Sequence, residues 1–171
     1  GAVLLRMLAS GICGTDKHTF NGETQQYAGT DHASSTPFPI IQGHENVGEV
    51  TAVGPDAKGV KVGDVRLIHP WMGCGECIVC KRGEENLCTK PCSVGIHRGG
   101  GFATHVMVPH PRYLFDIGNL PPERAAPLAC SGVTAYSALN KVSDTLAQAP
   151  VVMIGAGGVG LMALALHRKM G

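Results

Sequence analysis

Four cysteines lie within fifteen residues of this 171-residue chain, at Cys74, Cys77, Cys80 and Cys88. Their thiolates can close a tetrahedral shell around one Zn²⁺, and the glycines between and beside them allow the tight turns that such a shell needs. All four ligands would be protein atoms, which leaves no position for water, so the spacing predicts a structural zinc site. Two alternatives remain: Cys92 in place of Cys88, or four reduced cysteines in a turn without metal.

The whole chain holds seven cysteines, an odd number that cannot pair completely within one molecule. We recognise no export signal, so we expect a reducing, cytoplasmic location, where clustered thiols bind metal more often than they form disulfides. The formal net charge of +1 argues against nucleic acid and anionic membranes as partners. No apolar run approaches the roughly 18 residues of a membrane span. We therefore expect neither a nucleic-acid nor a membrane partner.

Short strands separated by glycine turns dominate the first part of the chain. The apolar patterns predict strands over residues 1–8, 47–53, 65–69 and 102–108. We expect these strands to form a β-rich domain over residues 1–118, with the cysteine-rich lobe at 73–92 inside it. Residues 21–39 are polar and rich in glycine and proline, which indicates a surface loop.

The pattern changes over residues 119–171, where helices are predicted from Pro121 and over Ser131–Asn140. Val151–Ile154 is a continuous apolar run, typical of a strand buried on both faces of a parallel sheet. Apolar residues then recur at helical spacing after residue 158. A single strand and helix cannot bury themselves, so we expect an α/β domain that has only started.

Gly155, Gly157 and Gly160 stand between this predicted strand and helix. The pattern GxGxxG alone is a weak signal, but between a strand and a helix it indicates a dinucleotide-binding turn. The first glycine makes the turn, the second lets the backbone approach a pyrophosphate, and the third lets helix and strand pack closely. A glycine-rich turn of an unrelated α/β protein is the alternative.

A second, scattered set of metal ligands consists of Cys13, His44 and Cys130. Each residue alone is a weak signal, because a lone cysteine or histidine usually belongs to a core. Together they offer two thiolates and one imidazole, with a fourth position open to water or substrate, which is the arrangement of a catalytic zinc. The carboxyl group of Glu45 directly follows the histidine.

Taken together, these motifs resemble the zinc-dependent medium-chain alcohol dehydrogenases, relatives of threonine and polyol dehydrogenases. The resemblance covers essentially the whole chain, and the motifs occur in the family's order. It implies a mixed β and α/β fold, in which a GroES-like catalytic domain precedes the start of a Rossmann domain. It also implies two Zn²⁺ per chain, a catalytic ion on the scattered set and a structural ion in the lobe.

The resemblance implies roles for further residues. Glu45 would approach the metal during water exchange, and Asp16 would orient the imidazole of His44. Thr15 and His18 would relay the substrate proton to solvent. Thr134 would line the nicotinamide pocket, and Gly155, Gly157 and Gly160 would bind the coenzyme. The implied reaction is a reversible hydride transfer between an alcohol and NAD or NADP, with NAD slightly preferred, in a homodimer or homotetramer.

Compared with that family, the chain is expected to lack the first strands and most of the coenzyme domain, so we expect the 171 residues alone not to oxidise an alcohol. The loop at 21–36 is longer than in typical members, either as part of a substrate cleft or interface or as a plain surface insertion. Two other functions stay open. The first is a non-catalytic or reductase-type relative, and the second is a zinc-ribbon module that binds a macromolecule.

Overall fold

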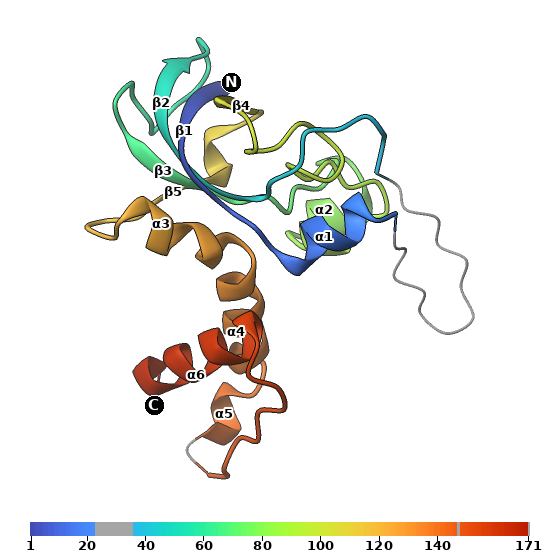
Figure 1. The fold of residues 1–171 in the computed structure, drawn as a ribbon, viewed down its shortest axis with the longest axis vertical. Coiled ribbons are helices and arrows are strands. Elements are labelled where there is room, and N and C mark those ends of the chain that lie inside the picture. Colours follow the sequence, from blue (N-terminus) through green and yellow to red (C-terminus); the bar gives the residue numbers. More distant parts are fainter. Residues whose placement is uncertain (23–35, 147, 171) are drawn as a thin grey trace.

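The computed structural model describes residues 1–22, 36–146 and 148–170. Its five strands form one antiparallel sheet in the order β4-β1-β2-β3-β5 (Figure 1). The strands are β1 (Val3–Gly11), β2 (Glu45–Val53), β3 (Val65–Ile68), β4 (His105–Val108) and β5 (Leu114–Asp116). The β-rich character of the first part is thus confirmed, although β5 was not predicted.

The main core lies on one face of this sheet. Alternate residues point into it because neighbouring side chains of a strand lie on opposite faces. The fully buried residues of the core are Val3, Leu5, Val50, Ile68, Met72, Val94 and Val108. A smaller cluster on the other face packs Val47 against Ala125 and Ala126. Ala9, near the end of β1, packs against this second cluster, so the cluster lies close to where the site residues begin.

The helices are mostly short. They are α1 (Gly14–Phe20), α2 (Ile78–Lys81), α3 (Pro122–Ala125), α4 (Ser131–Asn140), α5 (Ser143–Leu146) and α6 (Gly158–Met170). Helix α3 lies beside the sheet, and α4, α5 and α6 lie farther from it (Figure 1). Three single 3₁₀ turns cover Glu85–Leu87, Pro111–Tyr113 and Ala126–Ala129. The helices predicted after Pro121 and over Ser131–Asn140 are confirmed. Within the ranges given above, no helix is both long and apolar enough to cross a lipid bilayer.

The prediction of a buried strand at Val151–Ile154 is wrong for this structure. The segment has no regular structure, and Val152 and Ile154 are 82% and 98% exposed. A strand forms only where neighbouring strands satisfy its backbone N–H and C=O groups. In the part of the chain that the structure describes, no segment pairs with these residues, so their apolar composition alone does not produce a strand.

The strand predicted over 102–108 is shorter than expected, because β4 begins only at His105. The backbone just before it pairs elsewhere: Gly100 N–H donates to Ile41 O at 2.8 Å, and Phe102 N–H donates to Gln42 O at 2.9 Å. Residues 100–102 thus lie along the segment that leads into β2. The loop predicted at 21–36 falls almost entirely on residues 23–35, which lie outside the described ranges.

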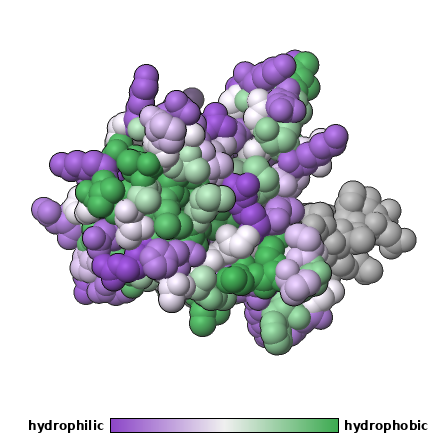
Figure 2. Space-filling view, turned by 90° about the horizontal axis from the view of Figure 1, so that it is seen from above, coloured by the Kyte–Doolittle hydropathy of each residue, from purple (hydrophilic) through white to green (hydrophobic). Residues whose placement is uncertain are grey.

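Apolar side chains also reach the surface. The face in Figure 2 carries hydrophobic patches between hydrophilic ones. Large apolar residues that are at least half exposed include Ile12, Phe20, Phe38, Ile41, Met107 and Phe115. Exposure of scattered apolar residues is ordinary for a folded protein. Helix α6 packs against α4, yet Leu161 and Leu164 on α6 are 56% and 42% exposed.

Candidate metal centres

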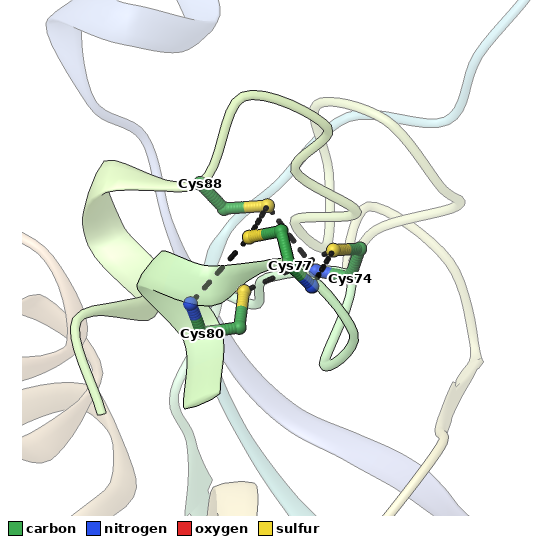
Figure 3. A group of neighbouring side chains, drawn as sticks. All are labelled: Cys74, Cys77, Cys80 and Cys88. Atoms are coloured by element: carbon green, nitrogen blue, oxygen red, sulfur yellow. Dashed lines mark hydrogen bonds between the residues drawn. The ribbon is translucent and has the colours of Figure 1, made fainter. Parts of the chain in front are cut away.

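The four cysteines of the lobe point toward one another (Figure 3). The Sγ atoms of Cys74 and Cys80 lie 3.9 Å apart, those of Cys77 and Cys88 lie 3.8 Å apart, and all four atoms fall within 4.8 Å of one another. A tetrahedron with Zn–S bonds of about 2.3 Å has S–S edges of about 3.8 Å. The lobe therefore has the spacing of a closed ZnS₄ site.

Backbone groups of the lobe favour ionised sulfur. The N–H of Cys77 points at Cys74 Sγ at 3.4 Å, and the N–H of Lys90 points at Cys88 Sγ at 3.3 Å. Hydrogen bonds from the backbone of Glu76 and Cys77 lower the pKa of Cys74 to about 6. A Cβ on Gly73 would lie 2.5 Å from Cys80 Sγ, so this position requires glycine.

Glu85, which the sequence analysis did not single out, fastens the lobe to the rest of the protein. Its carboxylate accepts hydrogen bonds from Gly73 N–H at 3.0 Å and Tyr113 Oη at 2.6 Å, and it pairs with Arg112 at 2.8 Å. Burial raises the pKa of Glu85, but the bonds from Tyr113 and Gly73 and the Arg112 charge outweigh it and hold the pKa below 4.5. No local sequence signal separates this glutamate from its neighbour Glu84.

We predict that Glu85→Gln lowers stability by about 1 kcal/mol or less, because Arg112 is half exposed. The pKa of Glu85 is lower in the folded protein than in the unfolded chain. The ionised carboxylate therefore stabilises the fold at pH values above the ordinary glutamate pKa, and this stabilisation is lost as the pH falls through the folded-state pKa. The stability difference from wild type should thus be full at neutral pH, above the ordinary pKa of glutamate, and shrink as the pH falls through the lowered folded-state pKa of Glu85. Urea unfolding of both proteins over this range tests it, and a pH-independent difference would contradict the assignment.

The second set of ligands comes together through the pairing of β1 with β2. Gly11, the last residue of β1, pairs with Glu45, the first residue of β2, so Cys13 lies just past one strand end and His44 just before the other. Cys130 follows the 3₁₀ turn whose residues Ala126 and Ala129 are buried. The Sγ atoms of Cys13 and Cys130 are 3.9 Å apart, again the edge of a tetrahedral zinc site.

One atom of this set lacks a partner. His44 is completely buried, and its Nε2 atom makes no hydrogen bond within the described ranges. A buried polar nitrogen without a partner is costly, and a metal ion would satisfy it. The ligand atoms of Cys13, His44, Glu45 and Cys130 all lie within 4.8 Å of one another. The donor set therefore fits zinc, with two sulfurs, one nitrogen and a carboxylate within reach.

Asp16 ties two of these ligands together. Its carboxylate accepts from the N–H of Cys13 at 2.9 Å and lies 3.0 Å from Nδ1 of His44. The first contact also closes the first turn of α1, a helix that the sequence analysis did not predict. Holding Nδ1 fixes the ring orientation and directs Nε2 toward the two sulfurs. Asp16 thus takes the position expected of a residue that orients the imidazole.

Charges in this set depend strongly on one another. Burial opposes a charge on His44, but Asp16 and the neighbouring Cys130 thiol outweigh it and raise its pKa to about 10. Burial and the neighbouring Cys13 raise the pKa of Cys130, although His44 acts in the opposite direction. Burial likewise raises the pKa of Glu45. A divalent cation among these atoms would stabilise both thiolates and displace the proton from His44.

The two residues of the predicted proton relay lie on α1, three positions apart and hence on one side of the helix. Thr15 is half-buried, and its Oγ1 accepts from Cys13 Sγ at 3.8 Å, whereas His18 is exposed. Thr134 is exposed on α4, one turn after Cys130. The structure thus brings Thr15 next to a ligand and leaves His18 and Thr134 accessible to solvent.

The glycine turn has the backbone that its pattern requires. Gly155 adopts φ of +99°, a conformation that strongly favours glycine. A Cβ on Gly160 would lie 2.1 Å from Gly155 O, so the third glycine packs against the turn itself. Gly157 has open space around it and precedes α6 by one residue. The start of α6 is therefore free of side chains on the side of this turn.

Trp71 is a second residue whose role the sequence did not reveal. Its Nε1 donates to the carbonyl of Ala129 at 3.2 Å, directly before Cys130, and its ring lies 5.5 Å from that of His44. It therefore contacts the surroundings of two ligands at once. Cys92, the alternative lobe ligand, donates its thiol to Gly73 O at 3.1 Å and does not belong to the group of four.

A family model described as "Alcohol dehydrogenase GroES-like domain" matches residues 1–119. The chain belongs to the zinc-type medium-chain alcohol dehydrogenase family. One member of this alcohol dehydrogenase family, an "NAD-dependent alcohol dehydrogenase" of Sulfolobus acidocaldarius, is 41% identical over 98% of the chain and 47% of its own length. Another of the same name, from Sulfurisphaera tokodaii, is 37% identical over 98% of the chain and 48% of its own length.

A solved alcohol dehydrogenase-family structure has the same fold. The D-arabinose dehydrogenase of Sulfolobus solfataricus superposes with a TM-score of 0.87 at 31% identity, over 98% of this chain and 50% of that one. These matches confirm the family and the fold class predicted from the sequence, a GroES-like domain followed by the start of a Rossmann domain. The chain spans about half the length of the curated relatives that it matches.

Proposed function

We propose that the intact protein is an alcohol dehydrogenase that transfers hydride reversibly between an alcohol or carbonyl substrate and a nicotinamide coenzyme. The observation that carries this proposal is the convergence of Cys13, His44 and Cys130. These residues come from three distant segments, two sulfurs lie at the spacing of a tetrahedral zinc site, and a buried Nε2 has no hydrogen-bond partner among the described residues. Family membership agrees with this chemistry, since relatives are named as NAD-dependent alcohol dehydrogenases.

In this proposal Cys13, His44 and Cys130 hold zinc, which supplies a Lewis acid that lowers the pKa of an alcohol hydroxyl. Asp16 keeps the imidazole oriented through Nδ1. Glu45 places a buried carboxylate within reach of the same centre, where it would be able to approach the ion.

Thr15 stands beside this centre with a hydroxyl that can accept the substrate proton. His18, exposed on the same helix, is proposed to pass the proton on to solvent. Thr134 and the three glycines at 155, 157 and 160 are proposed to contact the coenzyme. Backbone N–H groups at the start of α6 provide the positive end of a helix for its phosphates.

The lobe holds the second zinc in this proposal, as a structural ion bound by Cys74, Cys77, Cys80 and Cys88. We assign residues 1–118 to the catalytic domain, with the lobe at 73–92, and residues 119–171 to linking helices and the start of the coenzyme domain. NAD is favoured over NADP, because relatives bear the name NAD-dependent alcohol dehydrogenase. We also propose a cytoplasmic homodimer or homotetramer, as the resemblance implies.

Metal counting combined with activity tests this function. We expect two zinc ions per chain, and a chelator should remove one of them within minutes together with NAD⁺-dependent oxidation, while the closed lobe keeps the other. The assay should cover primary, secondary and polyol alcohols in both directions with both coenzymes. A single, tightly held zinc and no turnover in either direction would favour a zinc-ribbon module instead.

A further inference from the structure

The sequence around His44 contains a buried polar side chain that the proposed mechanism does not use. Asn46 is completely buried at the start of β2, two residues after the histidine. Its Oδ1 accepts from Ser10 Oγ at 2.7 Å, and its Nδ2 donates to the carbonyl of Gly43 at 2.9 Å. A buried amide whose oxygen and nitrogen are both hydrogen-bonded is hard to replace, because any other side chain leaves one of its partners without a hydrogen bond.

The Gly43 peptide that Asn46 contacts leads directly into His44. The carbonyl of this peptide accepts from Asn46 and, at 2.8 Å, from Gly101 N–H, while the N–H of Gly43, in the peptide before it, points at Asp16 Oδ1 at 3.3 Å. Gly43 has φ of +98°, so few side chains could take its place and the backbone there is unusual. Rotation of this peptide would move the imidazole that follows it.

The glycines at 95, 100 and 101 lie so close to Asn46 and to the Gly43 carbonyl that a side chain at any of them would clash. A Cβ on Gly101 would lie 1.7 Å from Oδ1 of Asn46, and its three closest atoms all belong to that amide. A Cβ on Gly100 would lie 2.4 Å from Gly43 O, and one on Gly95 would lie 2.5 Å from the same atom. Gly95, Gly100 and Gly101 thus pack closely around Asn46 and the backbone before His44.

We propose that Asn46 is a positioning residue of the catalytic metal site, an inference that rests on the proposed function. Asp16 fixes the ring of His44 through Nδ1, and Asn46 fixes the backbone of His44 through the Gly43 carbonyl. Gly101 has no side chain, which leaves room for the Asn46 amide in this position. Asn46 touches neither metal nor substrate, so its effect appears in how tightly and with what geometry the site holds a metal.

The test measures Co²⁺ binding by the intact protein after selective removal of the easily chelated metal. Cobalt in a site of two thiolates and one imidazole absorbs differently from cobalt in a four-thiolate lobe, so each site is read separately. Asn46→Leu keeps the side-chain shape and removes both hydrogen bonds, and Gly101→Ala pushes the amide away. The matched controls are Asn119→Leu at an exposed position and Gly99→Ala, whose Cβ would meet nothing within 4 Å.

We expect both test variants to bind Co²⁺ at the second site about ten- to a hundredfold more weakly, as for other residues that orient metal ligands. The visible spectrum of that site should shift, the lobe should keep its metal, and both controls should behave as wild type. The variant Asn46→Ala removes the amide atoms with which a side chain at residue 101 would clash. Adding Gly101→Ala to Asn46→Ala should therefore weaken Co²⁺ binding little further.

Folded variants with unchanged cobalt affinity and spectrum would overturn the inference while leaving the proposed function intact. Release of the lobe metal together with global unfolding in both Asn46→Leu and Asn46→Ala would also overturn it, since Asn46 would then serve general stability. A wild-type protein that binds no metal at the second site would refute the proposed function itself, and this inference with it.

Discussion

Replacing His44 by alanine is expected to remove the metal from the second site and to abolish alcohol oxidation by the intact protein. Four-ligand zinc sites have apparent binding free energies of about 10–16 kcal/mol, or roughly 3 kcal/mol for each ligand. Loss of one ligand should therefore weaken binding by about a hundredfold or more. The loss of metal affinity is larger here because the buried Asp16 carboxylate would lose the imidazole that stabilises its charge.

The measurement is zinc content by mass spectrometry after dialysis, together with steady-state oxidation of an alcohol that the wild type accepts. We expect one zinc per chain in the variant, located in the lobe, and no measurable turnover. His105→Ala is the matched control, because His105 is exposed on β4, where its Nδ1 lies 3.1 Å from the hydroxyl of Thr104. Two retained zinc ions in His44→Ala would show that the histidine is not a ligand.

The closed lobe was predictable because its ligands are close in sequence. Fifteen residues with tight turns can bring four sulfurs together whatever the rest of the fold does. The structure places the Sγ atoms of Cys77 and Cys88 3.8 Å apart, in keeping with that local argument. What remained hidden was Glu85, since its partner Tyr113 comes from a turn far along the chain.

The residue types suggested the second site, but its geometry was not predictable, because sequence spacing says nothing about whether residues 13, 44 and 130 lie close together. Their convergence follows from the register of β1 against β2 and from the packing of Ala129 before the last ligand. Such long-range pairing is determined by the whole core, and no local window of sequence contains it. The same limit applies to Asn46, whose role becomes visible only when Gly101 is found against it.

The wrong strand at Val151–Ile154 has a different cause. The composition of the segment is correct for a buried parallel strand, but a strand is a property of at least two segments. Secondary structure was predictable where partners lie within the chain, as for β2 between β1 and β3. Helix α1 was missed because its seven residues, Gly14–Phe20, include few strong helix formers. The hydrogen bond from Cys13 N–H to the Asp16 carboxylate stabilises its first turn.

Replacing Cys88 by serine is expected to release the lobe zinc and to lower the stability of the protein. The loss of about 3 kcal/mol of metal binding corresponds to a fall of about 6–12 °C in the unfolding temperature for a chain of this size. The lobe has few buried apolar residues of its own, so without metal its three remaining thiols cannot hold the turns together. Calorimetry with zinc analysis of the same samples measures both effects.

Cys92→Ser provides the matched control four residues away. Cys92 donates its thiol to Gly73 O at 3.1 Å, and a serine hydroxyl can donate the same bond, so this variant should keep its zinc and its unfolding temperature. The pair also decides which cysteine is the fourth ligand. Zinc lost from Cys92→Ser and kept by Cys88→Ser would reverse the assignment. Trp71 lies two residues before the lobe, and its ring lies beside that of His44, so Cys88→Ser should also weaken the second site, although less than it weakens the lobe.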